Sequence, residues 1–323
     1  MRAVYAESMS PQSPLDGLRV GELPEPEAPA GFRRVSVRAS ALNHHDLWSL
    51  RGVGLGQDKL PMILGCDGAG VDDDGNEVIV HSVISSPGWQ GDETLDPRRS
   101  LLSESHPGTM ADFVWVPEQN LVPKPADLSF QEAACLPTSW LTAYRMLFTT
   151  SPAAPGSTIL VQGAGGGVST ALIALARAAG YRVWVTSRSA EKRDRARELG
   201  AQEVFDAGAR LPERVDVVFD SVGEATWAHS LKALKPGGAV VTCGATSGPA
   251  PSADLNRVFF LQLRVLGSTM GTRNELERLA QFLAGTGVRP AIDSVHPLKD
   301  ARAGFERMAA GEVFGKVIFD HGK

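Results

Sequence analysis

The pattern of apolar and polar positions predicts a first part of the chain built from short strands and turns. The segment RRVSVRAS at 33–40 places valine at alternate positions, which is typical of a half-buried strand. The segment GAGVDDDGNEVIV at 68–80 has two apolar runs around Asp74-Gly75-Asn76 and predicts a hairpin. Residues 85–109 are polar and contain several glycines and prolines, so they predict a surface loop.

Beyond Pro123 the pattern changes to buried strands that alternate with helices. The segment STALIALARAAG at 169–180 has helical periodicity, and AEKRDRARELG at 190–200 is a charged helix that ends in glycine. Six short apolar strands are predicted, at 157–163, 181–187, 203–207, 215–223, 237–244 and 263–269. This alternation predicts an α/β fold with a doubly wound parallel sheet.

The last segment reads as a strand, a helix and a final strand. Because that pattern does not simply extend a parallel sheet, we expect this tail to return to the first domain. The predicted organisation is therefore a first domain at 1–122, the doubly wound domain at 123–286, and a return to the first domain at 287–323.

The composition narrows the class of protein. The chain has 323 residues, 43% of them hydrophobic, and a net charge of −5, so nothing indicates the basic face that nucleic-acid binding requires. No apolar run approaches the roughly 18 residues that span a bilayer, and the first residues have no apolar signal region. Cys66, Cys135 and Cys243 lie far apart in the chain, which favours a reducing cytoplasm over a disulfide framework.

A glycine-rich loop, VQGAGGGVST at 161–170, lies between the first strand and the first helix of the doubly wound domain. Glycines in that context let the backbone approach a pyrophosphate, which then lies at the helix N-terminus. A structural turn is the alternative interpretation. The predicted dinucleotide contacts in this loop are Gly163, Gly165, Gly166, Gly167 and Val168.

The end of the second strand indicates which dinucleotide binds. NAD-selective enzymes usually place an acid there to bind the ribose 2′-hydroxyl, but TSRSAEK at 186–192 has no acid before Glu191. Ser187, Arg188 and Lys192 suit a 2′-phosphate instead, since arginine forms charge-assisted hydrogen bonds with phosphate. We therefore expect NADPH, although a solvated basic helix start would give the same pattern.

Several longer motifs resemble one family across essentially the whole chain. They are ALNHHDLWSLRG at 41–52, LGCDGAGV at 64–71, VQGAGGGVSTALIALARAAG at 161–180, DVVFDSVG at 216–223 and KPGGAVVTCG at 235–244, together with the segment 108–147. The chain resembles the medium-chain dehydrogenase/reductase superfamily. The resemblance implies a Rossmann domain inserted in a GroES-like, mostly β catalytic domain, with the active site in the cleft. It also implies a homodimer formed by edge pairing of the strand near 263–269.

Within the superfamily, the resemblance favours the zinc-less quinone oxidoreductase-like branch. Zinc-dependent alcohol dehydrogenases carry a cysteine ligand where this chain has Asn43, and a His-Glu pair where it has Cys66 and Asp67. A further ligand of those enzymes falls near Thr138. An unusual zinc site remains an alternative, with Cys66, Asp67, His44, His45 and His81 as the candidate ligands.

The resemblance implies hydride transfer from NADPH to a small molecule, a quinone or an α,β-unsaturated carbonyl. Asn43 is then the hydrogen-bond donor to the substrate oxygen, His45 relays a proton, and Thr142 lies beside the nicotinamide. Trp48 and Trp89 are candidates for lining the substrate pocket. Further cofactor contacts are expected at His44, Val222, Gly244, Ser268, Thr269 and Lys316. A structural role for His44 or His45, a zinc-dependent alcohol or aldehyde dehydrogenase, and a non-catalytic NADPH-binding protein remain alternatives.

Overall fold

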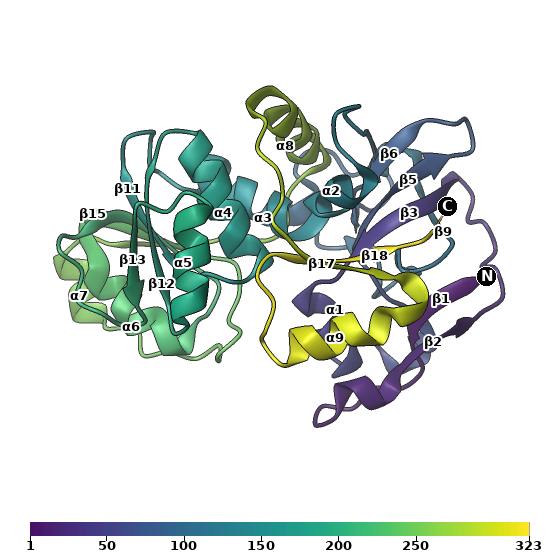
Figure 1. Ribbon diagram of the computed structural model, residues 1–323, viewed down its shortest axis with the longest axis horizontal. Coiled ribbons are helices and arrows are strands. Elements are labelled where there is room, and N and C mark those ends of the chain that lie inside the picture. Colours follow the sequence, from purple (N-terminus) through teal and green to yellow (C-terminus); the bar gives the residue numbers. More distant parts are fainter. Residues whose placement is uncertain (323) are drawn as a thin grey trace. The chain divides into compact units, whose positions relative to one another are not determined.

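A computed structural model describes residues 1–322, which form two compact units (Figure 1). The first unit contains residues 1–141, 270–287 and the chain from 292 onward. The second unit contains residues 142–269 and 288–291, so its sequence is inserted within that of the first.

The second unit is built on a six-stranded parallel sheet with the strand order β13-β12-β11-β14-β15-β16. The strands are β11 (Thr158–Gln162), β12 (Arg182–Ser187), β13 (Glu203–Asp206), β14 (Val215–Asp220), β15 (Leu234–Thr242) and β16 (Arg264–Gly267). This order is that of the dinucleotide-binding doubly wound fold, in which the chain reverses direction beside the first strand. The predicted parallel sheet is confirmed.

Helices follow the strands of this sheet, as the alternating pattern predicts. They are α4 (Gly167–Ala178), α5 (Ala190–Glu198), α6 (Glu224–Ala233) and α7 (Leu255–Phe260). Helix α4 is the most buried of them, with an unbroken buried run at 169–176. Because all six strands are parallel, their carboxyl ends and the loops that follow lie at one edge of the sheet.

The first unit is mostly β. Its largest sheet has the order β10-β6-β5-β3-β18-β17, and a further strand, β9, also pairs with β3. Its strands are β3 (Phe32–Ala41), β5 (Asp67–Asp72), β6 (Glu77–Val80), β9 (Phe113–Pro117), β10 (Leu121–Pro123), β17 (Ile292–Pro297) and β18 (Lys316–Asp320). Strand β18 runs antiparallel to β3, with Ile318 opposite Ala41. Strand β18, near the end of the chain, therefore belongs to the same sheet as β3.

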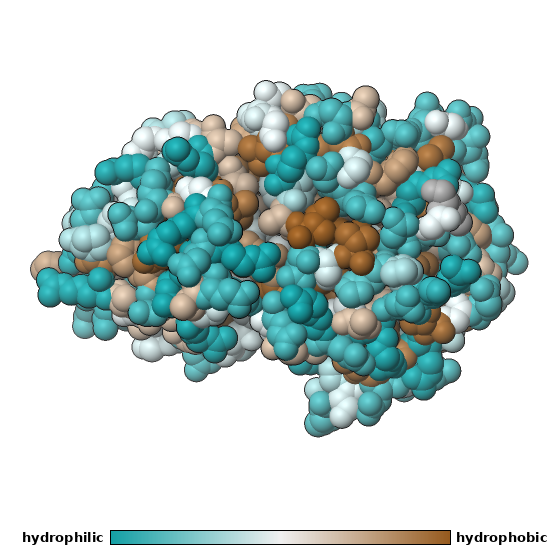
Figure 2. Space-filling view, in the orientation of Figure 1, coloured by the Kyte–Doolittle hydropathy of each residue, from teal (hydrophilic) through white to brown (hydrophobic). Residues whose placement is uncertain are grey.

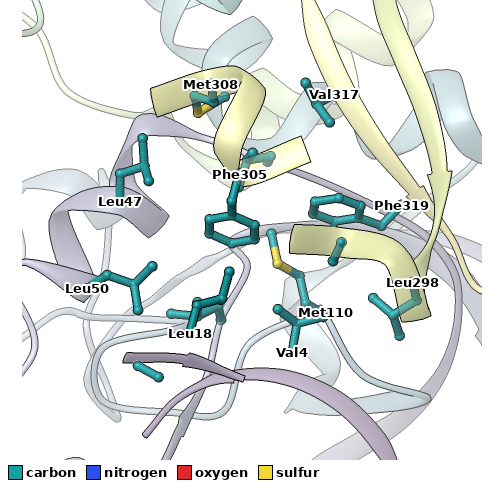
Figure 3. Close-up of a cluster of buried hydrophobic side chains, with 14 of the residues drawn as sticks. Val4, Leu18, Leu47, Leu50, Met110, Leu298, Phe305, Met308, Val317 and Phe319 are labelled. Carbon is teal, nitrogen blue, oxygen red and sulfur yellow. The ribbon is translucent and has the colours of Figure 1, made fainter. Parts of the chain in front are cut away.

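An apolar core joins the two ends of the chain within this unit (Figure 3). It lies between α1 (His44–Leu50), α9 (Ala301–Ala309), β18 and a small sheet of β1 (Arg2–Ala6), β2 (Leu18–Glu22) and β4 (Met62–Ile63). The rings of Phe305 and Phe319 stack in it, with 6.0 Å between centroids. Gly304 makes this approach possible, because a Cβ there would lie 2.8 Å from Val317 and 2.9 Å from the Phe319 ring. Helix α9 thereby fixes β18.

The boundaries between the units differ from the predicted 122/123 and 286/287. Helix α2 (Phe130–Ala134) packs on β3 and β5, and α8 (Arg273–Thr286) packs on β10 and the π-helix η5 (Leu136–Trp140). His81 also makes a 2.9 Å hydrogen bond with the carbonyl of Gly271. The boundary was predicted from a change of sequence pattern, whereas the apolar faces of these helices pack against the β unit.

The predicted surface loop at 85–109 has an ordered course. A short hairpin of β7 (Val83–Ile84) and β8 (Ser100–Leu101) brackets its first part. Buried Asp96 accepts backbone hydrogen bonds from Ser86 at 2.6 Å and Arg98 at 2.8 Å. The loop conformation is therefore set by its own polar contacts.

Polar side chains dominate the face of the molecule shown in Figure 2, with apolar side chains gathered in a few patches. Within residues 1–322 no helix combines the length and apolar character that crossing a bilayer requires.

Candidate active site

The start of helix α1 places Asn43 and is fixed by a buried carboxylate. Asn43 follows the last residues of β3 and directly precedes the helix. The fully buried Asp46 accepts hydrogen bonds from the backbone N–H of Asn43 and of Gly65, both at 2.9 Å. Burial raises the pKa of the Asp46 carboxyl above its ordinary value. These two bonds tie the helix start to the turn that leads into β5, so the backbone around Asn43 is held.

The side chain of Asn43 lies between a buried cation and a buried anion. The Lys316 ammonium donates to Asn43 Oδ1 at 2.7 Å, to Asp67 Oδ2 at 2.7 Å and to the carbonyl of Leu42 at 2.9 Å. The Asn43 amide nitrogen donates in turn to Asp67 Oδ2 at 2.8 Å. The side chains of Lys316 and Asp67 are 2% and 0% exposed, so both charges lie away from water.

This arrangement does not fit a zinc ion. The Lys316 ammonium already binds oxygens of Asn43 and Asp67, so a metal there would meet a fixed positive charge. Asp67 Oδ1 is buried and has no hydrogen-bond partner among residues 1–322, but a single carboxylate oxygen does not make a zinc site. The same residues contain no group of three or more His, Cys, Asp or Glu side chains placed to hold a metal.

His45 lies between a carboxylate and a thiol. Its Nε2 is 2.8 Å from Glu104 Oε1, and its Nδ1 is 3.4 Å from Cys66 Sγ. The thiol also lies 3.1 Å from the carbonyl of Leu102, to which it donates. A thiol carries one hydrogen, so the hydrogen between Sγ and Nδ1 belongs to the imidazole. With Nε2–H donating to Glu104, both ring nitrogens carry a proton.

The electrostatic surroundings of His45 agree with a charged imidazole. Burial lowers the pKa of His45, but its hydrogen bonds with Cys66 and Glu104 and the nearby Asp46 carboxylate more than offset that effect and leave it well above its ordinary value. Burial raises the pKa of the Cys66 thiol. The Glu104 side chain is 28% exposed, so this group of side chains has a route to solvent protons through the carboxylate.

The other side chains predicted near the substrate lie in different surroundings. His44 is exposed at the first position of α1. Trp48 is half-buried, with the Arg51 guanidinium 5.1 Å from its ring centroid. Trp89 lies on the 85–109 loop, where its Nε1 donates to the carbonyl of Asp92 at 3.0 Å. The structure thus brings His45 to a polar cluster, whereas the contacts of Trp48 and Trp89 are local.

In the second unit, the glycine loop has the geometry that a phosphate requires. Gly163 has φ +82°, a conformation that favours glycine. Gly166 caps α4 without a side-chain hydrogen bond, so the first backbone N–H groups of the helix have no side-chain acceptor from that residue. A Cβ at Gly166 would meet no atom within 4 Å. This open helix N-terminus fits a dinucleotide pyrophosphate.

The other predicted cofactor contacts of this unit follow the carboxyl ends of strands, at the same edge as the glycine loop. Ser187 and Arg188 stand at β12, Val222 follows β14, Gly244 follows β15, and Ser268 and Thr269 follow β16. Thr142 is buried in α3 (Leu141–Arg145). His44 and Lys316 are the exceptions among the predicted contacts, because both lie in the first unit. The Lys316 ammonium has three protein oxygens around it.

Two arginines near the end of β12 differ in their contacts. Arg193 donates to the carbonyl of Ser187 at 2.8 Å and pairs with Asp206 at 2.6 Å. Arg188 is exposed and forms no hydrogen bond or ion pair with another residue in the described part of the chain, 1–322. Ser189 accepts from the backbone N–H of Lys192 and caps α5. The guanidinium of Arg188 is therefore available to an added phosphate.

Two residues that position the predicted site were missed by sequence reasoning. Asp220 is fully buried and accepts backbone hydrogen bonds from Val222 at 2.8 Å and Gly223 at 3.0 Å, which sets the loop after β14. The sequence could have indicated Asp220, since it is an acidic residue at the end of an apolar strand. Glu104 gave no signal, because it lies in a polar loop 59 residues from His45.

Comparisons with known proteins match two separate segments of the chain. Residues 30–126 match the family model of the alcohol dehydrogenase GroES-like domain, and residues 167–285 match that of the zinc-binding dehydrogenases. A zinc-type alcohol dehydrogenase-like protein of Leptosphaeria maculans is 32% identical, over 88% of this chain and 89% of its own. A quinone oxidoreductase of Pseudomonas aeruginosa is 30% identical, over 88% of this chain and 90% of its own. The solved structure of an NAD-dependent alcohol dehydrogenase is 35% identical and superposes with a TM-score of 0.91, covering all of both chains.

Proposed function

Because the chain belongs to the medium-chain dehydrogenase/reductase superfamily of oxidoreductases, we propose that it reduces a quinone or an α,β-unsaturated carbonyl with NADPH and without zinc. The observation that carries this proposal is the hydrogen-bonded cluster of Asn43, Asp67 and Lys316. Oxidation of an alcohol needs a group that stabilises an alkoxide, which zinc supplies in metal-dependent enzymes. Reduction of a conjugated carbonyl spreads its charge onto an oxygen, for which a well-placed hydrogen-bond donor is sufficient.

Asn43 supplies that donor. An asparagine amide has two N–H groups, and the contact with Asp67 uses one of them. The second N–H donates to the carbonyl oxygen of the substrate as its negative charge develops. When NADPH is bound, it supplies the hydride from its nicotinamide.

We infer that His45 holds the proton that completes the reduction, and one of its two N–H groups must then leave its present partner, Glu104 or Cys66, to reach the substrate. Its imidazole carries two hydrogens between Glu104 and Cys66, and Glu104 is partly exposed. The reduced substrate takes up one proton, and the imidazole is reloaded from solvent along Glu104.

The cofactor preference is proposed from the end of β12. Arg188 and Lys192 suit a 2′-phosphate, and no acid stands there to favour a ribose 2′-hydroxyl. The glycine loop and the N-terminus of α4 hold the pyrophosphate. Thr142, Val222, Gly244, Ser268 and Thr269 are proposed to line the nicotinamide half.

A turnover assay tests the proposed reaction. We expect NADPH oxidation with simple quinones or enones, no oxidation of simple alcohols with NADP⁺, and no effect of a zinc chelator. Alcohol oxidation that is lost on chelation and restored by zinc would establish the metal-dependent alternative. Tight NADPH binding without turnover of any quinone or enone would favour a binding protein.

The Glu104→Gln variant is expected to lose activity at a lower pH than the wild-type protein. The Glu104 carboxylate raises the pKa of His45, so its removal lets the imidazole deprotonate at lower pH. Activity requires the protonated ring and therefore falls on the alkaline side, and that fall moves toward acid in the variant. The measurement is kcat against pH, with Glu93→Gln on the same loop as the control. An unmoved alkaline limb would remove His45 from the proton step.

We also propose that two copies pair along β16. This strand is at the end of the sheet order, and beside it α7 exposes apolar side chains. Val265 is 49% exposed, Phe259 64% and Phe260 81%, so three large apolar side chains within seven residues of the chain are exposed. Sedimentation equilibrium is expected to give twice the chain mass of 34.3 kDa, and the mass of one chain for Val265→Glu. Val295→Glu, at an exposed valine of the other unit, is the control; a wild-type monomer would contradict the pairing.

A further inference from the structure

The Lys316 ammonium has no hydrogen left for a cofactor phosphate. A lysine ammonium has three N–H donors, and the structure directs them to Leu42 O, Asn43 Oδ1 and Asp67 Oδ2. The side chain is 2% exposed, and the partner carboxylate is fully buried. A pyrophosphate would have to displace one of these contacts. The family position that suggested a cofactor contact therefore carries a side chain that acts inside the first unit.

The two charges fix which way the Asn43 amide points. An ammonium only donates hydrogen bonds, so the atom of Asn43 that faces Lys316 must be the oxygen. A carboxylate only accepts them, so the atom that faces Asp67 must be the nitrogen. The flipped amide would lose both hydrogen bonds. Its oxygen would then face the carboxylate of Asp67, and its nitrogen would face the ammonium of Lys316. The second N–H of Asn43 consequently has one direction in which to point.

The Lys316 charge also polarises the amide. A cation at the carbonyl oxygen favours the resonance form with a negative oxygen and a positive nitrogen. In that form the remaining N–H is a stronger donor, as expected for hydrogen bonds that reinforce one another in a low-dielectric interior. Lys316 and Asp67 carry opposite charges, so this ion pair adds no net charge to the interior.

We propose that Lys316, paired with Asp67, is a positioning residue that orients and polarises the Asn43 amide, so that a positive charge acts on the substrate oxygen through that amide. This inference rests on the proposed reductase function, in which Asn43 is the donor to that oxygen. Lys316 would then be a fixed cation that is separated from the reacting atoms by the Asn43 amide.

Paired replacement of the two charges separates this role from a structural one. Lys316→Met alone leaves Asp67 buried without its ion pair, which endangers folding. The double variant Lys316→Met/Asp67→Leu removes both charges, and exchanging a buried pair for apolar side chains is often tolerated. If Lys316 only neutralised Asp67, this variant would keep the wild-type kcat.

We expect kcat of Lys316→Met/Asp67→Leu for an enone to fall by about 10- to 100-fold, which lies within the range of couplings between contacting groups. The Kd for NADPH should change less than about 2-fold, since the glycine loop and the end of β12 lie in the other unit. When Asn43→Ala is added, kcat should fall no further than in Asn43→Ala alone, because the charges act through the amide. Thermal unfolding and NADPH binding establish that each variant is folded.

Several results would overturn the inference. A wild-type kcat in the double variant would show that Lys316 and Asp67 only neutralise each other and do not act on the Asn43 amide. A large rise in the Kd for NADPH with unchanged kcat would make Lys316 a cofactor contact after all. If the fold losses in kcat of the double variant and of Asn43→Ala multiply when the substitutions are combined, Lys316 acts independently of the amide. If the wild-type protein turns over no quinone or enone, the proposed function is wrong, and the positioning role of Lys316 is then also excluded.

Discussion

The Asn43→Ala variant is expected to lower kcat for enone or quinone reduction by about 10²- to 10³-fold, the usual effect of removing one oxyanion donor. The amide is 8% exposed and anchored on two sides, so its free N–H is already oriented before the substrate arrives. A donor of this kind acts where charge develops and needs no reorganisation during the reaction. Steady-state kinetics with saturating NADPH measure the effect.

A matched asparagine provides the control. Asn76→Ala removes an exposed side chain from the turn between β5 and β6, within the same unit, and should leave kcat unchanged. The Kd for NADPH should also be unchanged in Asn43→Ala. If Asn43→Ala keeps a wild-type kcat while it remains folded, the substrate oxygen is stabilised elsewhere and the metal-free mechanism has lost its donor.

The Arg188→Ala variant is expected to raise the Kd for NADPH by about 10- to 150-fold, which corresponds to the loss of one charge-assisted hydrogen bond of roughly 1.5–3 kcal/mol. The Kd for NADH should change little, because NADH has no 2′-phosphate. Titration of the protein with each nucleotide, followed by fluorescence or calorimetry, gives both constants. This comparison is discriminating because one similar solved structure is described as an NAD-dependent enzyme.

Arg214→Ala is the control for charge alone. Arg214 is exposed and directly precedes β14, so it lies at the amino end of the sheet, opposite the cofactor edge. Its removal should leave both dissociation constants unchanged at moderate salt. Equal weakening of NADPH and NADH by Arg188→Ala, or tighter binding of NADH by the wild-type protein, would withdraw the proposed preference for NADPH.

The second unit was predictable because its determinants are local. Each strand of four to nine residues contains a short apolar segment, and the glycine loop directly joins β11 to α4. Once the strands are parallel, their carboxyl ends share one edge, and the residues that follow them are brought together without further information. Asp220 fits the same logic, although its role in holding the loop after β14 appears only in its hydrogen bonds.

The first unit was less predictable because its site depends on distant residues. Lys316 and Asp67 are 249 residues apart, and no local pattern indicates that they pair. The resemblance placed Lys316 near the cofactor, whereas its buried position at the start of β18, the strand that pairs with β3, determines its partners. The helices at 130–134 and 273–286 were predicted in the other domain for a related reason, because the surface against which a helix packs cannot be derived from its own periodicity.

The late position of Lys316 sets the order in which the site is completed during synthesis. Asn43 and Asp67 leave the ribosome long before β18, while the whole insertion that carries the glycine loop is made in between. Until β18 pairs with β3, Asp67 has no buried cation beside it and the Asn43 amide has no fixed orientation. A chain interrupted before 316 would contain the entire nucleotide-binding unit without a finished catalytic amide. On the proposed function, nucleotide binding and substrate reduction would therefore become possible at different stages in the synthesis of the same chain.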